Sequence, residues 1–174
     1  MSYILAALLS AALLAADQIT KYFITANFVL GQSKPFWPGI LELTYIHNNG
    51  GAWGLMEGHT WLLLTVTLLI MIICIALLIK KGLKNKLLFW AICLILSGGL
   101  GNMVDRLFRG GEVVDFLHLQ FMPKFPVFNV ADCAVCIGAA LLLIYFVGDM
   151  IHDARLAKKS EEQPVEDSPL PKGR

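Results

Sequence analysis

Two aspartates, Asp115 and Asp132, are the residues whose type and setting best suit them for chemistry. Asp132 lies near the start of an apolar segment with no cation one helical turn away, and Asp115 lies in a polar stretch before it. Two neighbouring carboxyls can share one proton, because like charges close together cannot both ionise easily. The ionised member can then take a proton from water while the neutral member donates a hydrogen bond to a carbonyl, which predicts hydrolysis without a covalent intermediate.

The other polar residues of the apolar segments fall into small groups. Asp17 and Lys21 are one helical turn apart and can pair. Asn129 precedes Asp132 by three residues and shares its helix face. A further group, near the end of an apolar segment, comprises Asn102, Asp105 and Arg106.

Structural roles are the alternative for most of these groups. Ion pairs between Asp17 and Lys21, and between Asp105 and Arg106, would hold a helix bundle together. Gly98 is best explained by close helix packing, which small residues allow. Asn102, in turn, could simply cap the end of its helix.

Composition identifies the chain as an integral membrane protein. Of its 174 residues 57% are hydrophobic and 16% are charged, with a mean hydropathy of +0.67. No basic patch for nucleic acid is present. A spanning helix needs about 20 apolar residues, which predicts an all-α bundle of four transmembrane helices near residues 3–23, 61–79, 87–104 and 127–147. A cleaved export signal is the alternative for the first, but no Lys or Arg starts it and no Ala-x-Ala precedes Asp17.

Lysine placement predicts the orientation. Basic residues cluster in the short link after the second span and again after the fourth, and such clusters stay in the cytoplasm. Both termini are therefore expected in the cytoplasm, with a peptidase domain over 1–154 and a tail over 155–174 that is basic and then disordered from 160. The clustered residues are Lys80, Lys81, Lys84, Lys86, Arg155, Lys158 and Lys159.

The external segments are then 24–60 and 105–126. Residues 40–46 alternate between apolar and polar side chains, which predicts a strand, and Val113, Val114 and Phe116 favour another. We expect a small β-sheet, or cradle, on the outer face. A short amphipathic segment or an interfacial anchor is expected at Trp53, Leu55, Met56 and Glu57.

With this topology the polar groups converge on the outer boundary, and the second span carries no charge at all. Ionisable residues in spans are costly, which favours function over chance. Asp132 lies five residues past Val127, which predicts a depth of about 8 Å in the hydrocarbon.

Other intramembrane chemistries fit poorly. No His-Glu-x-x-His zinc motif occurs, Ser97 has no Gly two residues before it, and Asp149 lacks the first Gly of a Gly-x-Gly-Asp motif. Cys133 and Cys136 are spaced as C-x-x-C, but their apolar surroundings disfavour a metal or redox role.

Several blocks, in order from Asp17 to about Gly138, resemble the lipoprotein signal peptidase (signal peptidase II) family. The chain departs from the family at Gly51, where Ala or Ser is usual, and at Cys133, where many members have Ser. The matching blocks are Asp17-Gln18-Ile19-Thr20-Lys21, Asn48-Asn49-Gly50-Gly51-Ala52-Trp53, Gly98-Gly99-Leu100-Gly101-Asn102-Met103-Val104-Asp105-Arg106, Val113-Val114-Asp115-Phe116 and Phe128-Asn129-Val130-Ala131-Asp132.

The resemblance implies an aspartyl endopeptidase of the bacterial inner membrane with Asp115 and Asp132 as catalytic dyad. Its substrate would be a prolipoprotein carrying diacylglycerol on a cysteine, cut just before that cysteine near the outer face. We expect no cofactor or metal, and a monomer in contact with membrane lipid. The resemblance further implies positioning roles for Asn48, Asn102, Arg106 and Asn129, and supporting roles for Asp17, Lys21, Gly98 and Asp105.

Two other functions remain open at this point. A small proton- or cation-coupled transporter would use Asp17, Lys21, Asp105 and Asp132 as a path, but it would need polar groups across the whole membrane depth. A nonenzymatic assembly factor would tolerate an aspartate-to-asparagine change.

Overall fold

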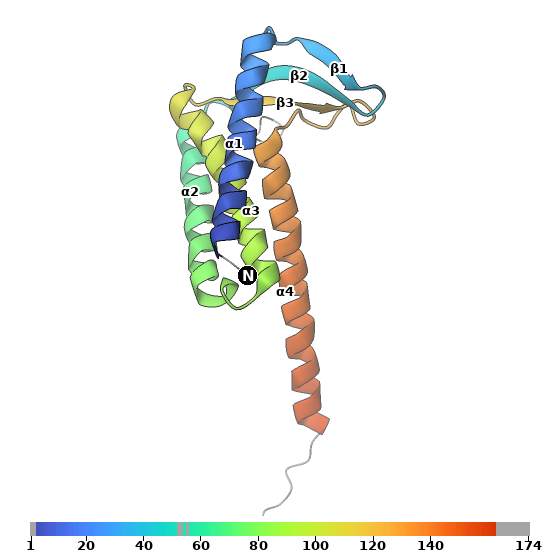
Figure 1. Cartoon of the computed structure of the whole chain (residues 1–174). Coiled ribbons are helices and arrows are strands. Elements are labelled where there is room, and N and C mark those ends of the chain that lie inside the picture. Colours follow the sequence, from blue (N-terminus) through green and yellow to red (C-terminus); the bar gives the residue numbers. More distant parts are fainter. Residues whose placement is uncertain (1–2, 52–53, 55, 163–174) are drawn as a thin grey trace, which may run out of the picture.

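Four long helices and a three-stranded sheet make up the computed structural model, which describes residues 3–51, 54 and 56–162. Within these ranges the helices are long and apolar enough to span a membrane, as predicted. The sheet caps one end of the bundle (Figure 1). The elements in order are α1 (Tyr3–Asn27), β1 (Ser33–Trp37), β2 (Leu41–Asn48), α2 (Thr60–Leu77) with a π-helical turn (Leu78–Gly82), α3 (Lys86–Phe108), β3 (Val113–Leu119) and α4 (Val130–Glu162).

Helix α3 is the centre of the bundle, since α1, α2 and α4 all pack against it. Its contact with α4 is close because Gly98 lies against the backbone of α4, where a Cβ would collide with the carbonyl oxygen of Ala131. Toward the opposite end, Leu88 and Ile92 of α3 are fully buried with Tyr145 of α4. Gly98 thus has the packing role that the sequence predicted.

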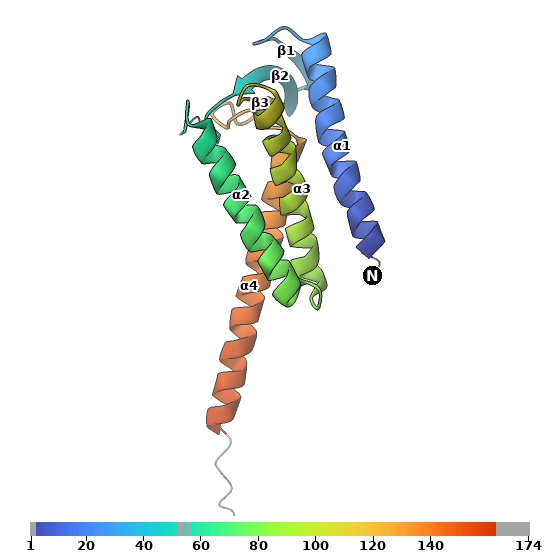
Figure 2. The same cartoon turned by 90° about the vertical axis from the view of Figure 1, so that its left-hand side faces the viewer.

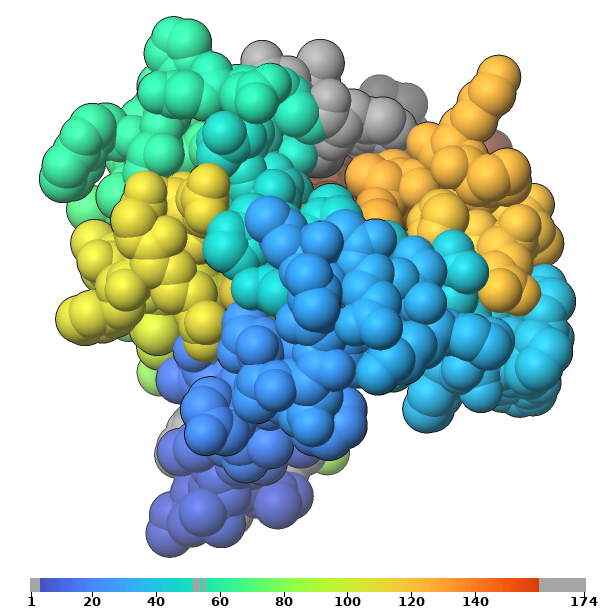
Figure 3. All heavy atoms as spheres, turned by 90° about the horizontal axis from the view of Figure 1, so that it is seen from above, coloured from blue at the N-terminus to red at the C-terminus, as the bar shows by residue number. Residues whose placement is uncertain are grey.

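The sheet is antiparallel, in the order β1–β2–β3. Strands β2 and β3 confirm the two predicted strand regions, whereas β1 was not predicted. All its residues are exposed and it contains Pro35, as edge strands tolerate. Figure 3, seen from the sheet end, shows the segment before β2 beside the segment after β3, where the backbone N–H of Gln120 donates to the oxygen of Ile40.

A small core joins this sheet to the bundle. Ile24 of α1 packs with Tyr45 of β2 and with Val114 and Phe116 of β3, and all four side chains are buried. The first helix therefore extends beyond its predicted end at residue 23 and supports the sheet from one side.

Helix α4 differs most from prediction. It begins at Val130, three residues later than expected, and continues to Glu162. Its 33 residues rise about 50 Å, more than the roughly 30 Å of a hydrocarbon core. Its far end extends alone below the other helices (Figure 2), so residues 160–162, expected to be disordered, are helical. Residues 163–174, Trp53 and Leu55 lie outside the described residues, and the predictions for them stay predictions.

Candidate active site

The residues expected to do chemistry meet in one cavity of about 400 Å³ beneath the sheet. Its polar wall contains both aspartates, with Asp115 on β3 and Asp132 in the first turn of α4. Further polar lining comes from β2 and α3. Of the predicted residues the cavity brings together Asn48, Asn102, Arg106, Asp115 and Asp132.

Asn129 connects the two aspartates. Its side-chain amide donates to Asp115 Oδ1 at 2.6 Å, and its backbone N–H donates to Asp132 Oδ2 at 3.1 Å. In return the backbone N–H of Asp132 donates to Asn129 Oδ1 at 2.9 Å. The reciprocal pair is a capping box, which starts α4 and holds both carboxyls relative to it.

The capping box corrects the predicted position of Asp132 along its helix. The earlier residue count assumed a helix from Val127, but Asp132 is the third residue of α4. Its carboxylate turns back to the helix start and accepts a hydrogen bond there. The carboxylate therefore lies at the very end of α4, and its depth in the membrane stays a prediction.

Asp115 is 1% exposed, on the strand position paired with Ile46 of β2. Its second oxygen accepts a hydrogen bond from Asn48 at 2.8 Å. Burial and, secondarily, the nearby charge of Asp132 raise the pKa of Asp115 to about 7, although the hydrogen bonds from Asn48 and Asn129 act in the opposite direction. A carboxyl with such a pKa can hold a proton near neutral pH, where an ordinary aspartate is ionised.

Asn102 links Asp132 to the interior. It donates to Asp132 Oδ1 at 2.7 Å, and its own oxygen accepts from Asn129 at 3.0 Å and from Lys21 at 3.0 Å. Asn102 lies within α3, well before that helix ends at Phe108, so the capping alternative is wrong.

Lys21 is fully buried and donates to three acceptors. Besides Asn102, its ammonium forms ion pairs of 2.9 Å each with Asp17 and with Asp105. An ammonium has three protons to donate, so this buried charge is completely satisfied. The predicted Asp17–Lys21 pair is confirmed, but it is part of a larger cluster.

Asp17 and Asp105 connect Lys21 to α4 and β3. The second oxygen of Asp17 accepts the backbone N–H of Ala131 at 2.9 Å, which is otherwise unpaired in the first turn of α4. Asp105 accepts the backbone N–H of Val114 beside Asp115 at 3.2 Å and pairs with Arg109 at 3.2 Å. No ion pair joins Asp105 to its chain neighbour among the described residues, so the predicted Asp105–Arg106 pair is wrong.

Arg106 instead faces the cavity. One of its terminal nitrogens donates to the carbonyl oxygen of Asn102 at 3.4 Å. Its Nε is buried and has no hydrogen-bond partner within residues 3–51, 54 and 56–162. The guanidinium therefore has donor capacity available to a bound molecule.

The sequence did not predict the site roles of Gln18 and Gly101, nor the apolar wall of the cavity. Gln18 donates to Asp17, to Asp105 and to the carbonyl oxygen of Gly101. A Cβ at Gly101 would lie 2.7 Å from an oxygen of Asp17, so only glycine leaves room for that carboxylate. Both residues lie inside the matching blocks, which was the available signal. The missed cavity wall is apolar and comprises Leu119, Phe125, Pro126, Val127, Phe128, Cys133 and Cys136.

No three His, Cys, Asp or Glu side chains gather as metal ligands in the part of the chain that the structure describes. The absence of a metal from the chemistry stays a prediction.

Replacing Lys21 with Met tests the buried cluster. The change leaves the carboxylates of Asp17 and Asp105 without their shared cation, so we expect the free energy of unfolding to fall by about 3–5 kcal/mol. Thermal unfolding in detergent, followed by tryptophan fluorescence, would show a lower midpoint. Lys81→Met is the matched control, because the Lys81–Asp149 pair is exposed and contributes little. Equal midpoints for the two variants would contradict the role of Lys21.

Known proteins resemble this chain in sequence and in fold. Residues 9–148 match the family described as Signal peptidase (SPase) II. The lipoprotein signal peptidase of Bacillus pumilus is 41% identical over 145 residues, which is 83% of this chain and 90% of the relative. That of Enterococcus faecalis is 40% identical over 142 residues, covering 82% and 87%. A bacterial membrane enzyme solved in meso at 2.3 Å has a TM-score of 0.80 and 34% identity over 85% of this chain and 90% of its own. The chain therefore belongs to the signal peptidase II family.

Proposed function

We propose that the chain is an aspartic endopeptidase that removes signal peptides from prolipoproteins. The observation that carries the proposal is the pair Asp115 and Asp132, joined through Asn129 at a cavity under the sheet. The relatives described above are lipoprotein signal peptidases, which supports a peptide bond as the target.

Charge balance supports one shared proton on the pair. Four carboxylates lie in the connected cluster, from Asp17, Asp105 and the two cavity aspartates, and they face three cations. With one proton on the dyad the cluster becomes electrically neutral, which a low-dielectric setting favours. The cations are Lys21, Arg106 and Arg109.

Hydrolysis then follows from the two states of the dyad. The ionised carboxylate takes a proton from the attacking water, and the neutral carboxyl donates a hydrogen bond to the scissile carbonyl oxygen. The tetrahedral intermediate collapses when its nitrogen receives a proton and the carbon–nitrogen bond breaks. The pair ends with one proton, as it began.

The remaining polar residues would position these groups. Asn48, Asn102 and Asn129 donate to the dyad and hold its oxygens in place. Arg106 lines the cavity, and its guanidinium would bind a carbonyl of the substrate backbone. The contacts of the remaining predicted residues agree with the supporting roles proposed for them. These residues are Asp17, Lys21, Gly98 and Asp105.

The apolar wall suits a lipid-bearing substrate. A prolipoprotein with diacylglycerol on its cysteine would lay acyl chains against Phe125, Val127 and Phe128, bringing the bond before that cysteine to the dyad. The lysines after α2 and on the far end of α4 lie opposite the sheet, which supports a cytoplasmic location for that end and an outer-face site in the bacterial inner membrane. The start of α1 also lies at the end opposite the sheet.

A transporter has no comparable support. The polar cluster is confined to one end of the bundle, and the described part of α2 carries no charge. The proteins reported above that resemble this chain are signal peptidases or a membrane enzyme.

The dyad is tested by Asp115→Asn and Asp132→Asn. Each change removes a group that must gain or lose a proton, and such groups contribute about 10²- to 10⁴-fold to rate. We expect a loss of at least about 10²-fold in cleavage of a defined prolipoprotein by the purified variants, read from a gel shift. Asn49→Ala should remain active, because Asn49 is next to Asn48 but its side chain donates to Glu57 and to no other described residue. Near-normal cleavage by either aspartate variant would reject the dyad.

The lipid requirement is tested by comparing one precursor with and without its diacylglyceryl group. Tethering the bond near the membrane boundary raises its local concentration, so we expect kcat/KM for the unlipidated form to be lower by about tenfold or more. Equal values of kcat/KM would remove the role of the acyl chains while leaving the dyad untouched.

The pH profile provides an independent test. Because the pKa of Asp115 is raised to about 7, activity should decline as the pH rises through that value and the dyad loses its last proton. The hydrogen bond from Asn48 lowers this pKa, so Asn48→Ala should move the alkaline limb of kcat/KM to higher pH. An unchanged limb in Asn48→Ala, with Asn49→Ala as control, would contradict this account.

A further inference from the structure

His47 of β2 forms two hydrogen bonds that the proposed hydrolysis does not use. Its Nδ1 lies 2.6 Å from an oxygen of Glu112, and its Nε2 lies 2.7 Å from the hydroxyl oxygen of Tyr45. Because both ring nitrogens have partners, the orientation of the imidazole is fixed. The three side chains form a continuous hydrogen-bonded chain from β2 to the residue just before β3.

Both ends of this chain of side chains are held in the structure. Tyr45 is buried in the small core that joins the sheet to the bundle. Glu112 lies in the link between α3 and β3, where the backbone N–H of Gly111 donates to the carbonyl oxygen of Arg106 at 3.0 Å. The pair of His47 with Glu112 therefore connects the end of β2 to the outer end of α3.

The end of β2 is separated from the rest of the sheet by an irregularity. The register between β2 and β3 shifts between Leu43 and Ile46, and such a shift interrupts the ladder of hydrogen bonds. Beyond it the residues from Ile46 to Asn48 pair with β3, and Asp115 belongs to this short segment. The hydrogen bond of 2.8 Å from Asn48 to Asp115 therefore needs local support.

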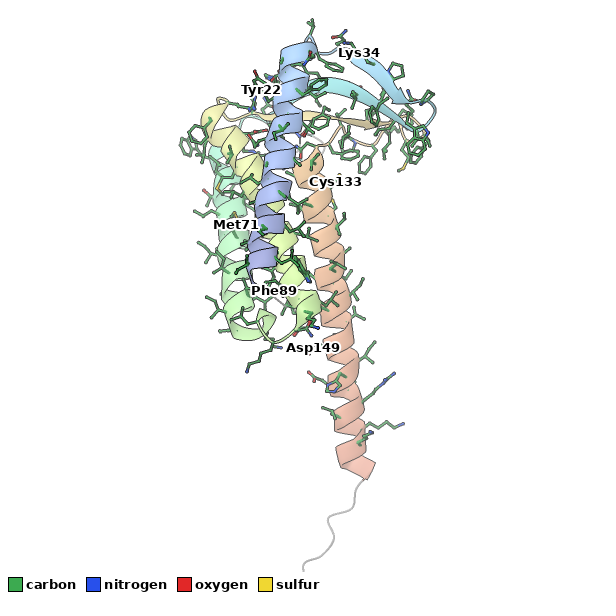
Figure 4. The ribbon with its side chains drawn as sticks, in the orientation of Figure 1. Tyr22, Lys34, Met71, Phe89, Cys133 and Asp149 are labelled. Carbon is green, nitrogen blue, oxygen red and sulfur yellow. The ribbon has the colours of Figure 1, made fainter. Side chains whose placement is uncertain are left out.

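His47 can give this support only from the face of the sheet opposite to the cavity. Successive residues of a strand point to opposite faces, so His47 and Asn48 point away from each other, and His47 does not line the cavity. Figure 4 shows Cys133, which directly follows Asp132, near the upper end of α4 and just beneath the sheet. The short segment must hold Asp115 in place above this helix start.

We propose that His47 is a positioning residue that holds the end of β2 so that Asn48 can donate to Asp115. The side chains of His47 and Glu112 are 36% and 40% exposed, so their pair adds little to stability and its role is geometric. The inference rests on the proposed function, because the position of Asp115 matters for cleavage only if the dyad is catalytic.

The same two strands offer a matched control. His118 of β3 and Glu42 of β2 are register partners and form a second pair of this kind at 2.7 Å. This pair lies on the other side of the register shift from Asn48. Its loss should therefore leave the contact between Asn48 and Asp115 unchanged.

His47→Phe tests the proposal, because it removes both hydrogen bonds and keeps an aromatic ring beside Tyr45. Without the pair the hydrogen bond from Asn48 should weaken, and that bond lowers the pKa of Asp115. We therefore expect the alkaline limb of kcat/KM to move to higher pH, by no more than in Asn48→Ala. His118→Phe should leave the limb unchanged.

The two kinetic constants should respond differently. Misplacing a reacting group by about 1 Å can cost about 10²-fold in rate, so kcat of His47→Phe should fall by up to about that factor. KM should change little, because His47 does not line the cavity. The charged groups that interact with Asp115 are the same in every variant, namely Asp132, Lys21 and Arg106.

Combining His47→Phe with Asn48→Ala tests the route of the effect. If His47 acts through Asn48, the double variant should have the same alkaline limb as Asn48→Ala alone. Glu112→Gln keeps a hydrogen-bonding partner for His47 and should resemble the unaltered chain. Glu112→Ala should resemble His47→Phe, and it takes the place of that variant if His47→Phe fails to fold.

Two results would overturn the proposal. One is an unmoved alkaline limb in His47→Phe and Glu112→Ala, and the other is a larger shift in the double variant than in Asn48→Ala. Either result would show that His47 does not act through Asn48.

Infrared difference spectroscopy separates this proposal from the proposed function. The carboxyl band of Asp115, identified by its loss in Asp115→Asn, can be titrated without substrate. If its pKa rises in His47→Phe but the unaltered chain cleaves no prolipoprotein, the proposed function fails and the positioning role stands. If cleavage is normal and the pKa does not move, the positioning role fails alone.

Discussion

The three-way contact of the Lys21 ammonium is the interaction on which the rest of the site depends. A fully buried charge is tolerated only when its partners satisfy it, and the partners here come from two helices, with Asp17 on α1 and both Asp105 and Asn102 on α3. Each partner uses its remaining capacity elsewhere. Asp17 also accepts a hydrogen bond from the start of α4, and Asp105 accepts one from β3. Asn102 donates to Asp132.

This cluster fixes the positions of the two carboxyls of the proposed dyad. Asp132 is fixed by the capping box at the start of α4, and that start is itself held by the carboxylate of Asp17 on Ala131. Asp115 is fixed by a strand whose neighbouring N–H is held by Asp105. Among the described residues, neither carboxyl of the proposed dyad pairs directly with a cation, which keeps Asp115 able to hold a proton near neutral pH.

Much of this was predictable, because ionisable residues in membrane spans are costly and therefore conspicuous. The four spans, two strands and most members of the polar cluster follow from the sequence, whereas Gln18 and Arg109 were missed. Partners across helices do not follow, because helical spacing says nothing of Lys21 on another helix. Within α3, the pairing of Asp105 with Arg106 rested on adjacency in the chain, whereas i,i+4 spacing indicates Arg109, the partner that the structure has. Strand β1 was missed because Pro35 and full exposure give it no alternating pattern.

The cavity separates two requirements of cleavage at a membrane boundary. Its polar side belongs to the hydrogen-bonded network around Lys21, where moving one group would leave a buried charge unsatisfied. Its other side, from Phe125 to Cys136, is formed mainly by side chains that lack strong hydrogen-bonding groups. Acyl chains of different shape, as proposed for the substrate, could therefore lie against that side without disturbing Lys21. Substrate preference can therefore vary through this wall while the catalytic geometry stays fixed.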